Sequence, residues 1–333
     1  MTLFDDNPPS PSGHEASGNE PLEFHSADQQ PVAVVPTTAL TGDPISYAAT
    51  LGGVAAPSAQ ALPEDLRISW SWPHLLIFII FWFASQIGIG IVAAVYYSME
   101  RHVAQSQMKQ VLESDPRFIV SSTVLWSALM LLFLYVTLSV LRGTPFWSSL
   151  GWKKLRPNSA AGIGRPWMYF LCGCGLSLLV AVAGSRVKNS ENLPIQELFK
   201  SRTGALLLMA MAVFVAPLVE ETLFRGYLYP VLARIITAVA QFFGMKSPTA
   251  IRTGVSSSVL VTGMLFGLLH APQLGFTLGF VALLTLVGVI FTFVRAWTGT
   301  VLASFLLHLG YNSFIAVTSI ITTRGFTHLP PLH

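Results

Sequence analysis

From residue 75 onward, long apolar stretches alternate with short polar connections. The apolar stretches cover residues 75–96, 118–141, 167–183, 205–219, 227–243, 255–269, 274–294 and 301–321. A helix of about 20 apolar residues is long enough to cross the hydrocarbon core of a bilayer. The pattern therefore predicts an all-α protein, a polytopic membrane helix bundle of about eight transmembrane helices. The fifth stretch is the shortest and weakest, so whether it spans stays open.

Residues 1–66 have a different character. They are rich in Pro, Ser, Gly, Ala and acidic residues and show no sustained hydrophobic period. Such a composition cannot bury enough apolar area to offset the entropy cost of ordering. They also lack the basic region followed by an apolar run that marks a signal peptide. We therefore expect a disordered acidic tail over 1–66 and an integral-membrane domain over 67–333.

Composition and charge agree with a membrane protein. Hydrophobic residues make up 52% of the 333-residue chain and charged residues only 11%, whereas a soluble domain has about 25% charged residues. Residues 1–70 hold nine acids and one base, and the rest of the chain holds seven acids and eighteen bases. No basic cluster is interleaved with aromatic residues, so the lipid bilayer is a predicted partner and nucleic acid is not.

The basic residues also predict an orientation. The connection 142–166 carries five bases and no acid, and loops rich in Lys and Arg usually stay on the cytoplasmic side. The N-terminus, two crossings earlier, is then cytoplasmic as well. We expect an integral protein of the plasma (inner) membrane with a cytoplasmic N-terminus. If the fifth stretch does not span, everything after it inverts.

Two adjacent glutamates end the fourth apolar stretch, and ionisable groups inside a membrane are costly and usually functional. Glu220 and Glu221 are the only acids after Glu197. Glu221 and Arg225 are spaced i, i+4 and can pair on one helical face, whereas Glu220 lies about 100° further round the helix. We therefore expect Glu220 to point into the bundle as a general base. The alternative is a structural ion pair that holds a helix end.

Two histidines lie well inside predicted helices. His270 closes the sixth stretch, and His308 lies in the eighth, four residues before Asn312 and on the same helical face. A lone histidine in a membrane is more often a satisfied polar residue than a ligand. Together with Glu220, however, these residues supply a base, two imidazoles and an amide donor, which amide hydrolysis needs. The candidate catalytic residues are Glu220, His270, His308 and Asn312.

Other hydrolytic chemistries are excluded by missing motifs. The sequence has no His-Glu-x-x-His motif and no Gly-x-Ser-x-Gly motif. It also has no aspartate after Asp115, which rules out a pair of aspartates within the later helices. Glutamate and histidine remain as the candidate residues for hydrolytic chemistry.

Three motifs, each on its own predicted helix, resemble the CPBP group of membrane proteins. They are Glu-Glu-x-x-x-Arg, Phe-x-x-x-His and His-x-x-x-Asn, in this order. Their residues here are Glu220, Glu221 and Arg225; Phe266 and His270; and His308 and Asn312. The resemblance covers about residues 200–315. The group contains the type II CAAX prenyl endopeptidases and the Abi-type or bacteriocin-processing proteins.

The resemblance implies an integral-membrane endopeptidase, usually described as a metallopeptidase, with a site open toward the cytoplasm. It implies that Glu220 activates the attacking water with help from His270. Glu221, Arg225 and Phe266 would then be supporting neighbours of the site. The implied partner is a peptide or protein substrate, which is prenylated for the eukaryotic members of the group.

The resemblance also implies a divalent metal such as zinc, with His270, His308 and Glu220 as its ligands. A catalytic zinc site typically has three protein ligands, as in a set of two histidines and a glutamate. Here that set uses the same glutamate that is needed as the base. Either Glu220 is a ligand and the base is another group, or Glu220 is the base and a metal is weakly held or absent.

Two non-enzymatic readings compete with the peptidase. Buried Glu and His also serve proton relays, as in a proton-coupled transporter. Such transporters usually carry repeats with interrupted helices at matching positions, and no such halves are visible here. An immunity or scaffold protein that keeps the fold without cleaving anything is the other reading.

Overall fold

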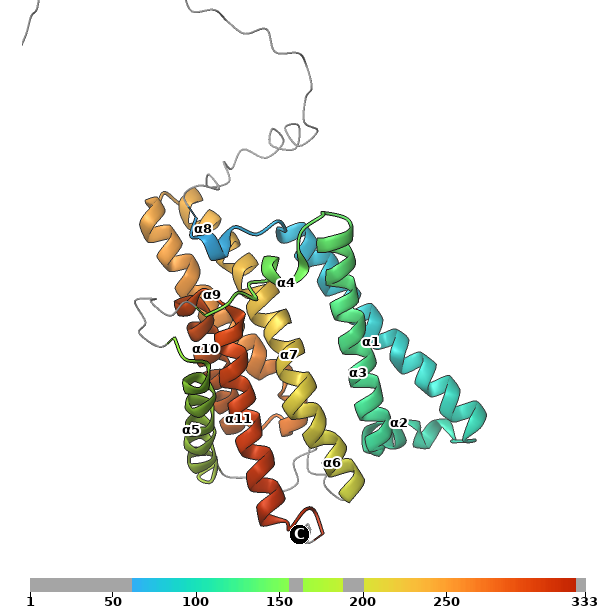
Figure 1. Ribbon diagram of the computed structural model, residues 1–333. Helices are drawn as coiled ribbons and strands as arrows, with labels where there is room; N and C mark the ends of the chain where they lie inside the picture. Colours follow the sequence, from blue (N-terminus) through green and yellow to red (C-terminus); the bar gives the residue numbers. More distant parts are fainter. Residues whose placement is uncertain (1–61, 156–163, 188–200, 328–333) are drawn as a thin grey trace, which may run out of the picture. The chain divides into compact units, whose positions relative to one another are not determined.

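A computed structural model describes residues 62–155, 164–187 and 201–327 (Figure 1). Helices make up the secondary structure of these ranges, and no β-strand occurs in them. The predicted all-α, polytopic bundle is therefore confirmed. All the described residues belong to one compact unit, residues 53–333.

The first half of the described chain contains two long helices joined by a short one, followed by a second short helix and a third long one. The N-terminal elements are the 3-10 turn η2 (Glu64–Leu66), α1 (Trp72–Glu100), α2 (Gln105–Ser114) and α3 (Pro116–Leu134), which continues as the π-helical segment η3 (Tyr135–Val140). They are followed by the short α4 (Phe146–Ser149) and by α5 (Pro166–Gly184).

The second half begins with one long helical element that changes its hydrogen-bond pattern several times. Its parts are α6 (Arg202–Ala210), the π-helical segment η5 (Met211–Val215), α7 (Ala216–Glu220), the π-helical segment η6 (Glu221–Leu228) and α8 (Tyr229–Phe242). The remaining elements are α9 (Ser247–Leu269), the 3-10 turn η7 (Pro272–Leu274), α10 (Leu278–Thr298) and α11 (Val301–Thr322).

Within the described ranges, seven helices are long and apolar enough to cross a membrane. The expectation of about eight is one too many, because the predicted fourth and fifth helices form a single element, Arg202–Phe242. The polar stretch between them does not break the helix. Glu221 and Arg225 form an ion pair within it, so neither charge has to leave the helix for water. A chain that crosses a membrane once with each of these seven helices starts α1 and ends α11 on opposite sides.

Close helix packing in the C-terminal half depends on small residues. Gly173 of α5 lies so near α11 that an added Cβ atom would meet the Leu307 carbonyl oxygen at 2.0 Å. Gly263 of α9 is similarly close to Val289 of α10. Such contacts let helix backbones approach one another in lipid, where no hydrophobic force drives them together. They fix α5 on α11 and α9 on α10.

The last residues of the predicted tail pack against α8. Of the predicted tail, residues 1–61 lie outside the described ranges, but 62–66 are packed. Leu62 and Leu66 are buried against Tyr229 and Ala233 of α8. These two leucines, spaced by four residues, form an apolar face around the short turn η2 and pack it on α8.

Candidate active site

The centre of the long helix holds a fully buried ion pair. The Arg225 Nη1 atom lies 3.0 Å from the Glu221 Oε1 atom, and neither side chain is exposed to solvent. The pairing predicted from the i, i+4 spacing is therefore present. A buried charge is tolerated only where a partner and further hydrogen bonds satisfy it, so the surroundings of Arg225 decide whether this arrangement is stable.

Arg225 is held by α10 as well as by Glu221. Its Nη2 atom donates to the Gly288 carbonyl oxygen at 2.9 Å, and its Nε atom donates to the Thr292 hydroxyl at 3.2 Å. The guanidinium carbon also lies 4.6 Å from the centre of the Phe266 ring, which gives a cation–π contact. Arg225 therefore ties the long helix to α9 and α10.

Glu220, one residue earlier, is in a different environment. Its side chain is 24% exposed, whereas that of Glu221 is 0% exposed. One carboxylate oxygen lies 3.8 Å from the His270 Nε2 atom and the other lies 3.9 Å from the His308 Nε2 atom. Both separations are too long for direct hydrogen bonds. The structure thus brings Glu220 between the two predicted histidines and leaves a gap on each side.

The partners of the two imidazoles fix which ring nitrogen carries a proton. The His270 Nδ1 atom lies 2.7 Å from the Phe266 carbonyl oxygen, and the His308 Nδ1 atom lies 3.0 Å from the Glu221 Oε1 atom. Carbonyl and carboxylate oxygens accept hydrogen bonds, so both Nδ1 atoms donate. In each neutral ring the Nε2 lone pair then faces Glu220.

Asn312 is not brought to Glu220 by any hydrogen bond in the described chain. Its Nδ2 atom donates to the Ala212 carbonyl oxygen at 2.7 Å. Ala212 lies in η5, and a π-helical segment shifts the backbone hydrogen bonds so that a carbonyl can accept from outside the helix. Asn312 shares the helical face of His308, as expected, but one of its amide hydrogens is used to bind η5.

Several residues around the site carry no motif and were missed in the sequence. Gly288 and Thr292 hold Arg225, and the Phe291 ring lies 4.7 Å from the His308 ring. A Gly-x-x-x-Thr spacing on an apolar helix is too common to single out. Arg225 itself was the available signal. A charged arginine inside a membrane needs hydrogen-bond acceptors, and these must come in part from a neighbouring helix.

The connection before α5 also reaches the site. The Trp152 Nε1 atom donates to the Thr222 hydroxyl at 3.1 Å, next to Glu221. The Trp152 ring packs on Phe305 of α11 at a centroid distance of 5.3 Å. Thr300 Oγ1 donates to the Lys153 carbonyl oxygen at 2.6 Å, which anchors the same connection on the turn before α11. The basic loop thus packs directly on the helices that carry Glu221 and His308.

The start of α1 is attached to the far end of η6. The His74 Nδ1 atom lies 2.7 Å from the Tyr227 hydroxyl, and the Trp70 indole donates to the Tyr227 carbonyl oxygen at 3.3 Å. His74 lies at the edge of an apolar stretch, where the sequence pattern gives it no role. Its burial shows that α1 contacts the long helix mainly through its first turns.

A metal ion does not fit the described side chains as they stand. In the parts of the chain that the structure describes, no group of three or more His, Cys, Asp or Glu residues is arranged to hold one. Neighbouring ligands of a tetrahedral zinc ion lie about 3.4 Å apart, because each bond is about 2.0–2.1 Å long. The distances of 3.8 and 3.9 Å from Glu220 to the two imidazoles exceed this value. A metal held by His270, His308 and Glu220 stays a prediction.

Comparisons with known proteins bear on the same segment. Residues 202–314 match the family described as Type II CAAX prenyl endopeptidase Rce1-like. Neither the curated proteins nor the solved structures contain a significant match to the chain. The matched segment runs from the start of α6 into α11 and contains all three motifs of the site. Residues 202–314 are therefore similar to the Rce1-like type II CAAX prenyl endopeptidases, in agreement with the predicted resemblance to the CPBP group, and the apolar helices of the described chain indicate an integral membrane protein.

Proposed function

We propose that this protein hydrolyses a peptide bond inside the membrane with a water molecule that Glu220 activates. The observation that carries the proposal is the partly exposed Glu220 carboxylate between two imidazole Nε2 atoms. Glu221, its neighbour, is fully buried and paired, so it is not available to a substrate. Of the two glutamates, only Glu220 has both access and partners suited to acid–base chemistry.

The first step uses the gap between Glu220 and His270. A water molecule beside the 3.8 Å separation can donate one hydrogen bond to the carboxylate and one to the His270 Nε2 lone pair. Glu220 takes a proton from this water, and the hydroxyl oxygen attacks the scissile carbonyl carbon. The π electrons of the carbonyl move to its oxygen and create an oxyanion.

The second step returns the proton. The carbon–nitrogen bond of the tetrahedral intermediate breaks, and the leaving amine takes the proton that Glu220 acquired. The products are a carboxylic acid and an amine, and Glu220 is again a carboxylate. Hydrogen-bond donors stabilise the oxyanion in such reactions. The candidates on α11 are the second amide hydrogen of Asn312 and the Nε2 atom of His308 in its protonated form.

The buried pair of Glu221 and Arg225 positions these groups. Glu221 accepts a hydrogen bond from the His308 Nδ1 atom at 3.0 Å and thereby fixes the direction of its Nε2 atom. Arg225 holds Glu221 and is itself held by Gly288 and Thr292. These residues support the site without touching the reacting atoms.

The family match supports a CAAX-type substrate, a protein cleaved near a lipidated cysteine. The charges support a site reached from the cytoplasm. Arg142 donates to the Ser69 carbonyl oxygen, so the basic connection after α3 and the segment before α1 lie on one side of the membrane. Because basic loops remain cytoplasmic, we place both there. The plasma membrane is the proposed location.

The test is cleavage of a peptide panel that includes farnesylated CAAX peptides by the purified protein in detergent. Wild type is compared with Glu220→Gln and with Glu100→Gln, the same change at an exposed acid at the end of α1. Each sample is measured with and without a strong chelator. We expect cleavage by wild type and Glu100→Gln only. Cleavage by a folded Glu220→Gln protein would refute the mechanism.

The same comparison addresses the rival functions. A proton-coupled transporter would show flux that Glu220→Gln abolishes, with no cleavage by wild type. A scaffold would show neither activity nor any effect of Glu220→Gln on binding. Loss of cleavage on chelation would restore a metal to the mechanism.

A further inference from the structure

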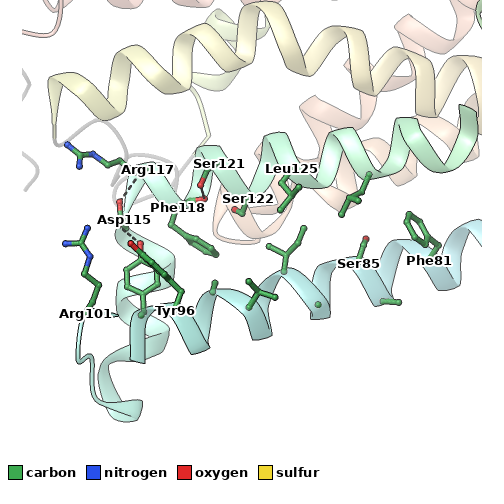
Figure 2. Close-up of a pocket in the computed structure, with 17 residues that line it drawn as sticks. Phe81, Ser85, Tyr96, Arg101, Asp115, Arg117, Phe118, Ser121, Ser122 and Leu125 are labelled. Carbon is green, nitrogen blue, oxygen red and sulfur yellow. Dashed lines mark hydrogen bonds between the residues drawn. The ribbon is translucent and has the colours of Figure 1, made fainter. Parts of the chain in front are cut away.

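A large groove lies between α1 and α3, away from the candidate active site. Its volume is about 930 Å³, within the range of about 300–1,000 Å³ that is usual for ligand sites. Figure 2 shows the two helices with the groove between them, from Phe81 and Ser85 at one end to Arg101, Asp115 and Arg117 at the other. The groove is therefore apolar along its length and polar at one end.

The polar end has two guanidinium groups that the described residues leave unpaired. Arg101 and Arg117 are both exposed, and neither takes part in an ion pair with the residues that the structure describes. Arginine presents a planar fork of donors that suits a phosphate group. Two such groups at the end of an apolar groove therefore complement a ligand with a phosphate attached to hydrocarbon chains.

Among the described residues, the nearby acid Asp115 forms no ion pair with the Arg101 or Arg117 side chain. Asp115 accepts hydrogen bonds from the Tyr97 hydroxyl at 2.6 Å and from the Arg117 backbone nitrogen at 2.9 Å. Burial would raise the pKa of the Asp115 carboxyl, but the hydrogen bond from Tyr97, those from the backbone and the positive charge of Arg117 lower it below its ordinary value. The carboxylate is thus satisfied by a hydroxyl and by the start of α3.

The groove is on the membrane side opposite to the basic connection. Its α1 residues run from Phe81 to Arg101, the later part of that helix, and its α3 residues run from Arg117 to Leu129, the earlier part of that antiparallel helix. The basic connection instead meets the beginning of α1, through Arg142 and Ser69. The lipid chain of a substrate that approaches from the side of the basic connection would lie in the other half of the bilayer. A membrane lipid of the groove's own leaflet is the occupant that fits.

We propose that the groove between α1 and α3 binds one glycerophospholipid, with its phosphate at Arg101 and Arg117 and an acyl chain between the helices. Such a lipid would replace the protein contacts that α1 lacks, because only 6% of its most apolar window is buried. The proposal is independent of the peptidase reaction and stands if that reaction is absent.

The chain offers a matched pair of variants for the test. Gly88 lines the groove and Gly90 does not, yet an added Cβ atom would meet no protein atom within 4 Å at either position. Both changes replace glycine in the same helix, so both should favour helix formation to a similar extent. Gly88→Phe fills the groove, and Gly90→Phe is the control.

Charge is tested in the same way. Arg101→Gln/Arg117→Gln removes both guanidinium groups. Arg186→Gln/Arg324→Gln makes the same charge change at exposed residues after α5 and α11, outside the groove. All four variants and the wild type are exposed to vesicles of phosphatidylglycerol and phosphatidylcholine that also contain diacylglycerol and farnesol, extracted in mild detergent and analysed by native mass spectrometry.

We expect the wild type and both controls to keep one phospholipid per chain after detergent washing. Arg101→Gln/Arg117→Gln should keep about tenfold less, the effect of losing one or two charge-assisted contacts. Gly88→Phe should also keep about tenfold less, because the phenyl ring occupies the space of the acyl chain. Equal retention by Gly88→Phe and Gly90→Phe would overturn the proposal. So would tight retention of diacylglycerol or farnesol that ignores the arginine change, because the groove would then select a neutral chain and not a phosphate.

Discussion

The two long N-terminal helices and the C-terminal bundle are both strongly apolar but make very different contacts. The most apolar window of α1 has a mean hydropathy of 2.4 and is 6% buried, whereas that of α11 has a mean hydropathy of 1.5 and is 44% buried. The less apolar helix, which carries His308 and Asn312, is therefore the more buried one. Hydropathy identifies spans, but in lipid the polar and small residues decide which spans pack together.

We expect the C-terminal bundle, which holds the candidate active site, to lose its activity when one carboxylate is removed. Glu220→Gln should lower peptide cleavage by about 10³-fold, since a general base contributes roughly 10²–10⁴-fold. Cleavage is measured with saturating peptide, and folding is checked by thermal unfolding in detergent. Glu100→Gln, at the end of α1, should change neither quantity. A similar loss in both variants would mean that acid removal in general, and not the position of Glu220, affects activity.

The buried pair in the same half should control stability. Glu221→Gln leaves Arg225 buried without its counter-charge, which should cost about 3–5 kcal/mol in the free energy of unfolding. Arg225→Met should cost a similar amount, and the double variant should lose less than the sum of the two. Denaturant-dependent unfolding of the four proteins measures this coupling. A stable but inactive Glu221→Gln protein would show that the roles of the two glutamates are reversed.

Helix packing provides a sharper contrast between the two regions. Gly173→Ala should destabilise the protein by about 1–3 kcal/mol, because the new Cβ atom meets the backbone of α11. Gly90→Ala in α1 meets no atom and should be neutral or stabilise the protein by up to about 1 kcal/mol. Melting temperatures in detergent should therefore move in opposite directions. Equal shifts would mean that α1 packs as tightly as α5.

The smallest expected effect lies at the connection from α1 to α3. Asp115 caps α3, and its pKa is lowered in the folded protein because its hydrogen bonds outweigh its burial. This stability is present above the unfolded pKa, about 4, and is lost as the pH falls through the folded value. Asp115→Asn keeps a capping oxygen but removes the negative charge from its hydrogen bonds, which should cost about 1 kcal/mol at pH 7. The difference between wild type and variant should vanish at pH 2–3 in thermal unfolding.

The sequence predicted well what depends on local spacing. The apolar stretches correspond to the observed spans, and the i, i+4 spacing of Glu221 and Arg225 correctly predicted their pairing. The position of Glu220 between His270 and His308 could be proposed only from the motifs, because three helices have to meet. No local pattern contains that information.

The wrong and missing predictions have physical causes. The polar residues 220–225 suggested a break between two helices, but a charge that is paired inside a helix does not interrupt it. The contact from Asn312 to Ala212 depends on the π-helical segment η5, whose shifted carbonyl has no signature in an apolar sequence. Gly288 and Thr292 were missed because their role is defined by Arg225 on another helix.

The unequal lengths of the spans have a consequence for the surrounding bilayer. At about 1.5 Å per residue, the 19 residues of α5 extend about 28 Å and the 41 residues of the long helix extend about 61 Å. The hydrocarbon core is about 30 Å thick. No single thickness suits both, so tilt and local deformation of the lipid must vary around the perimeter of the protein. Its stability and activity should therefore respond to acyl-chain length in reconstituted membranes, with an optimum that reflects a compromise between its shortest and longest helices.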